Sequence, residues 1–575
     1  MRKGPTSLLY ATILTTSLLG TSPDAAQLPP FVASLASPSP QSGSYLGGAI
    51  STGDVNGDGY DDVVVGETLA NVGGAVHAGR VQIFLGPGLT SVLSRTAPSP
   101  QEDTYFGMCV ATGDWNGDGV DDLVVGEPGA TLGPLSNAGR AYVFLGPGLT
   151  SPINLLEPTP AAFSGFGHSL ATGDVNGDGF GDVVVGAWLE GGGPFGGIYN
   201  SGEAFVFFGP TLASVVPLTQ PVPQLGSRFA GSLATGDVNG DGFDDVVVGA
   251  PRTDVASPLA ADAGMGFVFL GPSLASFVPM AEPVPEAGAW FGYSVASADV
   301  DGDGFDEVLV GAPFADGGGA QDAGEAFLFV GPGLTTVLTL TEPTPEASAR
   351  FGQSAAVGDV NGDGFADLVA GAEGATAGGL ADAGEAFVIF GPALTPVLPM
   401  AQPIPEPSAG FGVSVSAGDV TGDGLEEIAV GAPQAGAPGS GRAYVFVPRI
   451  DLGLNRLALS ASAGGTLDFS LAAGTANGGR PFLLVGSASG TSPCFPIGSV
   501  CLPIVVDPVT LLLLQPGTAS LFVGTLDALG QATRSFPIAP GAFPPSAVGL
   551  RLSWAYALFP PIDYASRPIV FEIGI

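Results

Sequence analysis

An acidic loop that recurs seven times is the feature that most constrains the fold of this chain. The first copy, DVNGDGYDD, spans residues 54–62, and later copies follow at intervals of 60 to 63 residues. The seven loops begin at Asp54, Asp114, Asp174, Asp237, Asp299, Asp359 and Asp419. Self-similarity at a fixed interval indicates one structural unit used repeatedly, so the repeat unit decides the architecture.

Each repeat has the pattern of four short strands. An aromatic residue and a glycine open the repeat, as at 106–107, and a short alternating segment leads into the acidic loop. A β-branched segment such as DVVVGA (182–187) follows, then a variable loop, a segment such as GRAYVFLG (139–146), a Gly-Pro turn and a fourth segment. Alternation and β-branched residues are typical of strands. Four strands in each of seven repeats predict an all-β fold, a seven-bladed β-propeller.

The two ends of the repeated region are incomplete in complementary ways. The seventh repeat stops after its third strand, whereas residues 31–40 align with the fourth strand of the first repeat, 91–100. A linear solenoid is the alternative to a ring, but it would leave both ends open. We therefore expect residues 31–37 to pair with 441–447 and close the ring, so that the propeller spans 31–448.

These motifs resemble FG-GAP repeats, which form the propeller of integrin α subunits and occur in many secreted bacterial proteins. The resemblance rests on the Phe-Gly pairs, the Asp-rich loops and Gly-Ala-Pro at 249–251, 311–313 and 431–433. In repeats one, two, three and six, Gly-Glu-Thr, Gly-Glu-Pro, Gly-Ala-Trp and Gly-Ala-Glu stand in place of Gly-Ala-Pro. The resemblance covers residues 45–447 and implies an FG-GAP propeller. It does not imply integrin signalling, because the sequence shows no counterpart of the transmembrane helix or the long extra domains of those subunits.

The acidic loop has the composition of a calcium site. Positions 1, 3, 5 and 9 of the first loop hold Asp54, Asn56, Asp58 and Asp62, and position 7, Tyr60, offers its backbone carbonyl. Ca²⁺ takes six to eight oxygen ligands from a tightly wound loop. An EF-hand would need a glutamate at position 12 and a following helix, whereas position 12 here is a valine within a strand. We therefore expect an oxygen-ligand loop in a β-hairpin, closed by Asp62 from the start of the next strand.

A turn rich in Asp and Asn without a metal is the alternative interpretation. The loops hold 27 of the 54 acidic residues within 63 residues, and carboxylates so close together repel one another unless a cation offsets them. We therefore expect up to seven structural Ca²⁺ ions. The sequence predicts the weakest site in repeat seven, where Thr421 and Glu427 replace Asn and Asp, whereas repeat five gains a carboxylate at Asp301.

The expected ligands are the side chains at positions 1, 3, 5 and 9 and the backbone carbonyl at position 7 of every loop. They are Asp54, Asn56, Asp58, Tyr60, Asp62, Asp114, Asn116, Asp118, Val120, Asp122, Asp174, Asn176, Asp178, Phe180, Asp182, Asp237, Asn239, Asp241, Phe243, Asp245, Asp299, Asp301, Asp303, Phe305, Glu307, Asp359, Asn361, Asp363, Phe365, Asp367, Asp419, Thr421, Asp423, Leu425 and Glu427. Seven copies of one loop indicate a repeated structural device, not one pair of catalytic carboxyl groups as in a glycosidase.

The charge of the chain excludes several classes of partner. Acidic residues number 54 and basic residues 15, which gives a formal net charge of −39. Such a chain repels nucleic acid and anionic membranes. Two histidines and three cysteines form no Ser/His/Asp or Cys/His constellation, so the sequence predicts no enzyme.

The N-terminus has the features of a secretory signal. Arg2 and Lys3 precede an apolar stretch, residues 8–20, that is too short to span a bilayer. A buried N-terminal helix is the alternative. We expect residues 1–26 to be a signal peptide with an open cleavage site, no transmembrane segment, and a secreted protein that acts extracellularly or at the cell surface.

Beyond residue 448 the repeat ends. Residues 451–575 contain alternating segments separated by Pro and Gly turns, which predicts a C-terminal β-sandwich. Adhesion, glycan binding and capping of the propeller are open as its role. Cys494 and Cys501 form either a disulfide or two free thiols, and Cys109 is expected to be a core residue.

In a propeller the acidic loops lie on one face, and the loops joining strands two and three lie on the other, which binds ligand in the integrin resemblance. The longest of these loops, 187–201, contains Trp188, Phe195 and Tyr199, which suit a protein or glycan contact. Packing of Trp188 into a neighbouring blade is the alternative. We therefore expect a secreted calcium-binding propeller that acts in binding or adhesion to an extracellular protein or glycan. A structural scaffold of the cell surface or matrix is the second hypothesis, and a non-catalytic part of a polymer-degrading hydrolase system is the third.

Overall fold

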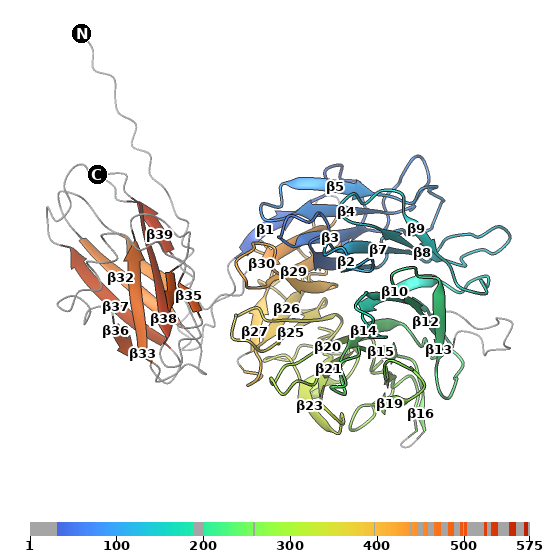
Figure 1. The fold of residues 1–575 in the computed structure, drawn as a ribbon. Coiled ribbons are helices and arrows are strands. Elements are labelled where there is room, and N and C mark those ends of the chain that lie inside the picture. Colours follow the sequence, from blue (N-terminus) through green and yellow to red (C-terminus); the bar gives the residue numbers. More distant parts are fainter. Residues whose placement is uncertain are drawn as a thin grey trace, which may run out of the picture.

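The computed structural model describes residues 31–446, apart from 189–200, 257–258, 396 and 437–438, and the backbone of nine strands between 452 and 572. Residues 31–446 form seven four-stranded antiparallel sheets. The sheets follow one another around a ring in chain order (Figure 1). The predicted all-β, seven-bladed propeller is confirmed.

The first three blades each use four consecutive strands. Blade one contains β2 (Leu46–Gly53), β3 (Asp62–Glu67), β4 (Arg80–Leu85) and β5 (Ser91–Arg95). Blade two contains β6 (Val110–Gly113), β7 (Asp122–Glu127), β8 (Arg140–Phe144) and β9 (Ile153–Leu155). Blade three contains β10 (Phe166–Gly173), β11 (Asp182–Ala187), β12 (Glu203–Phe208) and β13 (Ser214–Thr219).

The remaining blades follow the same order. Blade four contains β14 (Ser232–Gly236), β15 (Asp245–Ala250), β18 (Met265–Phe269) and β19 (Phe277–Met280), and a small ribbon of β16 (Val255–Ala256) and β17 (Leu259–Ala260) lies in its long loop. Blade five contains β20 (Ser294–Ala298), β21 (Glu307–Ala312), the short 3₁₀ helix η1 (Gly317–Gly319), β22 (Glu325–Val330) and β23 (Thr336–Leu340). Blade six contains β24 (Ala355–Gly358), β25 (Asp367–Ala372), β26 (Glu385–Ile389) and β27 (Val397–Met400). Blade seven contains β28 (Val415–Gly418), β29 (Glu427–Ala432), β30 (Arg442–Phe446) and β1 (Phe31–Leu35).

The second strand of every blade is buried along its whole length, as in β3. The buried clusters join neighbouring blades: Val64 and Ile83 of blade one share a cluster with Leu123 and Tyr142 of blade two. A strand covered on both faces needs apolar residues at successive positions, without alternation. The valine runs of the sequence therefore hold the blades against one another.

The glycine at the Gly-Ala-Pro position of one blade contacts the glycine of the Phe-Gly pair of the next blade. A Cβ atom on Gly66 would lie 2.1 Å from the carbonyl oxygen of Gly107 in the next blade, and Gly107 has a φ of 85°. Phe106 beside it is fully buried, with its ring 5.6 Å from that of Tyr142 and 6.2 Å from that of Phe144. Glycine permits this close backbone approach, and the phenylalanine fills the space beside it.

The ring closes as the sequence predicts. β1 pairs antiparallel with β30, with Ala33 opposite Val445 and Leu35 opposite Ala443. Leu35 is 2% exposed and belongs to the cluster between blades seven and one. The N-terminal strand therefore completes the last blade and covers its outer edge.

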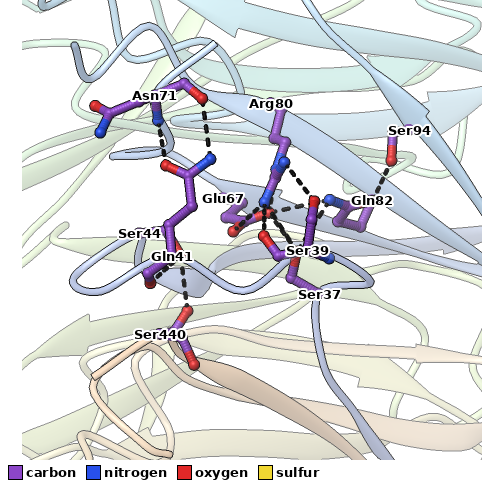
Figure 2. A network of polar contacts seen from close by, with 10 residues as sticks. All are labelled: Ser37, Ser39, Gln41, Ser44, Glu67, Asn71, Arg80, Gln82, Ser94 and Ser440. Atoms are coloured by element: carbon purple, nitrogen blue, oxygen red, sulfur yellow. Dashed lines mark hydrogen bonds and ion pairs between the residues drawn. The ribbon is translucent and has the colours of Figure 1, made fainter. Parts of the chain in front are cut away.

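A buried ion pair ties the segment after β1 to blade one (Figure 2). Arg80 donates to both carboxylate oxygens of Glu67, Nε to Oε2 at 2.5 Å and Nη2 to Oε1 at 2.8 Å. Ser37 and Gln82 donate to Oε2 of Glu67 at 3.1 and 3.0 Å. Because Glu67 is fully buried, loss of any of these donors leaves its charge less compensated.

Three other blade junctions place glutamates at the positions of both Ser37 and Arg80. These pairs are Glu157 with Glu203, Glu282 with Glu325, and Glu342 with Glu385. The first member of each pair is buried, and one of its carboxyl oxygens has no hydrogen-bond partner in the part of the chain that the structure describes. Burial, with a smaller contribution from the charge of nearby glutamates, raises the pKa of Glu157, Glu282 and Glu342 to about 7. At neutral pH these buried glutamates are therefore partly ionised, and their negative charge destabilises the folded protein at these junctions.

Replacing the three buried glutamates with glutamine (E157Q/E282Q/E342Q) is expected to stabilise the protein at pH 8. The ordinary glutamate pKa is 4.5, so each group binds a proton on folding between about pH 4.5 and pH 7, and stability falls as the pH rises through that window. One pKa unit corresponds to about 1.4 kcal/mol, and solvent screening reduces the gain to on the order of 1 kcal/mol per junction. Urea titrations at pH 8 and pH 4.5, with saturating calcium, measure the difference, which should vanish at the lower pH.

Gln220 supplies the matched control for these three substitutions. It occupies the equivalent position opposite Met265, and its amide donates to Thr253 Oγ1 at 3.0 Å. Gln220→Glu should destabilise the protein at pH 8 and do so less at pH 4.5. A stability difference of the triple variant that does not change with pH would contradict the charge explanation.

The strands beyond the propeller form separate sheets. They are β31 (Leu452–Leu457), β32 (Gly465–Ala472), β33 (Pro481–Ser487), β34 (Phe495–Ile497), β35 (Val500–Leu502), β36 (Val523–Thr525), β37 (Gln531–Ile538), β38 (Arg551–Leu558) and β39 (Ile569–Glu572). The sheet orders are β31-β32-β37 and β36-β33-β38-β39, with β34 and β35 in a hairpin. The β-sandwich stays a prediction, and the signal peptide and the Cys494–Cys501 pairing lie outside the described residues. No helix in the described part of the chain is long and apolar enough to cross a membrane.

Candidate metal centre

The seven acidic loops join the first and second strands of the blades and form a hydrogen-bonded ring. In each loop the backbone N–H at position 8 donates to the backbone carbonyl at position 1 of the preceding blade. The seven bonds run from Asp61 to Asp419, Asp121 to Asp54, Gly181 to Asp114, Asp244 to Asp174, Asp306 to Asp237, Ala366 to Asp299 and Glu426 to Asp359, at 3.0 to 3.4 Å. The loops therefore occupy one face of the propeller and fix one another's positions.

The aspartate at position 1 organises each loop from within. In the first loop Asp54 Oδ1 accepts from the backbone N–H groups of Gly57 and Asp58 at 2.8 and 3.1 Å, and its Oδ2 accepts from Gly59 at 2.8 Å. Asp58 Oδ1 accepts from the N–H of Tyr60 at 3.1 Å. The loop thus wraps around its own carboxylates, as a calcium-type loop does.

The carboxyl group at position 9 lies beneath this turn. Asp62 begins the buried second strand and is fully buried, and Asn56 Nδ2 donates to both of its oxygens at 3.0 Å. Burial is the main cause that raises the pKa of Asp62 to about 6, and the nearby charges of Asp58 and Asp54 add to it. A cation would offset this stored charge.

Other repeats show the same condition at position 9. Burial is again the largest cause that raises the pKa of Asp122, Asp182 and Asp245 to about 6 and that of Asp367 to about 8. In repeat five, ligand oxygens of Asp299, Asp301 and Glu307 all lie within 4.8 Å of one another. The structure thus brings together the side chains expected at positions 1, 3 and 9 in that repeat. An all-oxygen donor set of this kind suits a hard divalent cation.

Repeat seven differs in its internal bonding. Thr421 Oγ1 donates to Glu427 Oε1 at 3.2 Å, and the backbone N–H of Thr421 donates to Oε2 at 2.8 Å. A hydroxyl group that donates to the closing carboxylate stands where five loops have an asparagine amide and repeat five has the carboxylate of Asp301. The prediction that this is the weakest cation site stays a prediction.

Two further loop positions have roles that the sequence analysis missed. The side chain at position 7 packs on the position-4 glycine of the preceding loop: a Cβ on Gly117 would lie 2.7 Å from the ring of Phe180. The acid at position 8 also reaches back, since Asp121 Oδ2 accepts from the N–H of Asp54 at 3.0 Å. The recurring acid at Asp61, Asp121, Asp244, Asp306 and Glu426 is the sequence signal that could have revealed the second role.

On the opposite face, one of the three predicted aromatic ligand residues falls within the described chain. Trp188 stacks on His168 with ring centroids 4.0 Å apart, and the guanidinium of Arg228 from the next blade lies 4.5 Å from the centroid of its ring. Trp188 therefore packs across a blade junction, as the alternative interpretation expects. Phe195 and Tyr199 lie outside the described residues.

Comparisons with known proteins agree with this architecture. The FG-GAP repeat profile matches residues 166–207, 229–269, 291–329, 351–389 and 411–446, and an FG-GAP-like repeat profile matches 54–125. Integrin alpha-5 of Xenopus laevis is 34% identical over 224 residues, which cover 37% of this chain and 20% of that protein. Phosphatidylinositol-glycan-specific phospholipase D of Bos taurus is 35% identical over 176 residues, 28% of this chain and 21% of that protein.

These relatives match only part of this chain, 37% and 28% of its length. The chain spans about a fifth of the length of the curated relatives it matches. Among solved structures, a fungal alcohol oxidase of the AA5 family in complex with copper covers 96% of this chain at 11% identity and a TM-score of 0.42, which is too low to bear on function. The repeated region of this chain therefore consists of FG-GAP and FG-GAP-like repeats, and residues 31–446 form an integrin alpha-like, seven-bladed β-propeller.

Proposed function

We propose that this protein is a secreted, calcium-stabilised propeller that binds an extracellular protein or glycan. The observation that carries the calcium proposal is the ring of seven acidic loops, in which buried position-9 carboxyl groups lie beneath exposed carboxylates. Side chains at positions 1, 3, 5 and 9 and the carbonyl at position 7 would hold the ion. When bound, Ca²⁺ supplies positive charge that neutralises these carboxylates; it has no catalytic role in this proposal.

The binding proposal rests on a difference between the two faces of the propeller: one has similar loops and the other has variable loops. The acidic loops are nearly identical in sequence and tie the blades together, whereas the loops joining second and third strands differ in length and residue type. Function in such folds resides in variable loops held by a rigid scaffold. The integrin alpha relatives support a protein ligand.

Binding of purified full-length protein to a panel of extracellular proteins and to a glycan array tests this function. We expect saturable capture of one class of ligand in calcium, loss of capture in EDTA, and recovery when calcium is restored. Absence of capture in every condition would favour the structural scaffold. Calcium-independent capture would separate ligand binding from the acidic loops, and turnover of a glycan would support the hydrolase-associated hypothesis.

A further inference from the structure

The residue before the opening residue of each blade, a phenylalanine in six blades and Leu46 in blade one, has a left-handed backbone conformation. Their φ values are positive throughout: Tyr45 67°, Tyr105 59°, Gly165 66°, Arg228 55°, Trp290 58°, Arg350 63° and Gly410 64°. Glycine adopts this conformation freely, and two blades use it, whereas a larger side chain is strained there. In the other five blades a tyrosine, an arginine or a tryptophan has this strained backbone conformation. Such strain points to a function of the side chain.

Three of these residues join a continuous set of rings and guanidinium groups across blades three to six, on the face opposite the acidic loops. Trp188 lies between His168 at 4.0 Å and Arg228 at 4.5 Å. The Arg228 and Arg252 guanidinium carbons lie 5.6 and 5.5 Å from the ring centroid of Trp290, and that of Arg350 lies 5.4 Å from Phe314. Contacts of this kind orient a guanidinium group without neutralising it.

Arg228 differs from the other two arginines in its charge balance. Arg252 pairs with Asp262 at 3.1 Å, and Arg350 pairs with Glu373 at 2.6 Å. Within the described chain no carboxylate pairs with Arg228, and no acceptor is hydrogen-bonded to its guanidinium group. Asp262, which pairs with Arg252, acts on Arg228 through its charge, but no carboxylate of the described residues forms an ion pair with Arg228. The Arg228 donors are thus held in place and available to an external acceptor.

A cavity opens beside this set of residues. It has a volume of about 240 Å³ and is lined by the first strands of the blades, with His168, Tyr293 and Gln353 among its walls. His168 Nδ1 and Gln353 Oε1 are buried and have no hydrogen-bond partner in the described part of the chain. Burial lowers the pKa of His168 to about 4, with a further contribution from Arg228, so its ring is neutral at physiological pH. The cavity therefore has unpartnered polar atoms in its wall, and Arg228 lies near one of them, His168.

We propose that Arg228 binds an aspartate or glutamate side chain of an acidic protein ligand beside this cavity. A guanidinium group matches a carboxylate with two parallel N–H···O bonds, which would give Arg228 a role at its strained position. His168 and Gln353 would receive polar groups of the ligand that enter the cavity. This proposal rests on the proposed function and names the chemistry of its ligand.

A protein carboxylate fits the site better than a sugar does. Recognition of a sugar ring relies on an open aromatic face, whereas His168 and Arg228 already lie against the indole of Trp188. The ring of Trp290 likewise contacts Tyr293 at 6.1 Å and Phe314 at 4.8 Å. The aromatic residues here hold the arginines in place, so recognition falls to the guanidinium donors.

Peptide binding by the full-length protein in saturating calcium tests the proposal. The probe is a fluorescent peptide of alternating glycine and aspartate, with a glycine–asparagine twin as its control. Ionic strength near 0.15 M limits the general repulsion by the acidic surface to about 8 Å. The key variant is Arg228→Gly, because glycine occupies the equivalent positions 165 and 410 and relieves the backbone strain. We expect this variant to keep or raise the melting temperature and to lose about tenfold or more in affinity for the aspartate peptide.

Arg252→Gln is the matched control, since Arg252 contacts the same tryptophan but already has Asp262 as its partner. Its affinity for the aspartate peptide should stay within about twofold of wild type. Equal binding of both peptides, or undiminished binding by Arg228→Gly, overturns the proposal. Binding of polygalacturonate in preference to the peptide also overturns it, although a lost response in Arg228→Gly would then assign the site to acidic glycans. If the Arg228→Gly variant still binds a protein or glycan from the capture panel, the proposed function holds and only the assignment of this site is wrong.

Discussion

Removal of calcium from the purified full-length protein is expected to lower its melting temperature by on the order of 10 °C or more. An ion that binds only the folded state stabilises it by RT ln(1 + [L]/Kd), about 2.7 kcal/mol per site at one hundred times Kd, and seven loops share the effect. The melting temperature of a propeller of this size shifts by about 1–2 °C for each kcal/mol. Differential scanning calorimetry in calcium and in excess EDTA measures the change.

The buried carboxyl at position 9 allows a sharper form of this experiment. Asp62→Asn removes a ligand charge in calcium, but in EDTA it removes a buried charge that faces Asp58 and Asp54. The substitution should therefore lower the melting temperature in calcium and leave it unchanged or raise it in EDTA. Asp103→Asn is the control, because Asp103 is an exposed acid outside the acidic loops, and its one ion pair within the described residues is with His77. Equal melting temperatures in calcium and EDTA, or the same sign of the Asp62→Asn effect in both, would refute structural calcium.

The sequence was sufficient for the architecture because the repeat determines it. The chain has seven copies of one strand pattern, and the fourth strand of the last copy is found at residues 31–37. This arrangement predicts a closed ring, and β1 pairs with β30 accordingly. The alternate spacing of oxygen-bearing residues also located the acidic loops and their buried closing carboxyl, as Asp62 shows. Each of these features repeats at a constant interval, so a single chain displays it without an alignment.

The features that the sequence analysis missed are contacts between side chains of different blades. Asp121 bonds to the loop of the preceding blade, and Glu282 lies near Glu325 only after the sheets are placed side by side. The position of the Arg228 guanidinium likewise follows from the left-handed backbone at that residue and from two tryptophans in separate blades. Trp188 was expected from its loop, but its stacking on His168 was not, because the two residues are 20 positions apart. Residues 451–575 lack a repeat, and there the sequence predicts strands without fixing their arrangement.

Deletion of residues 31–37 should have the second large effect on this protein. The deletion removes β1, exposes the edge of β30, and takes Leu35 from the cluster it shares with Val63 and Val65. It also removes Ser37, which donates to the buried Glu67 carboxylate. Loss of one buried leucine alone costs about 2–5 kcal/mol, so the whole deletion is expected to cost on the order of 5 kcal/mol or more.

The exposed strand edge predicts how this deletion variant fails. An unpaired edge is a template for pairing with another chain, so the variant should form oligomers or aggregates at concentrations where the full chain does not. Size-exclusion chromatography with light scattering and urea titration measure both effects. The control is removal of residues 1–30 alone behind the same heterologous leader, which leaves β1 in place and should change neither property.

Addition of the peptide FVASLASPSP, residues 31–40, should restore part of the lost stability by refilling the vacant strand position. A deletion variant that stays monodisperse with an unchanged melting temperature would show that the ring does not depend on its N-terminal strand.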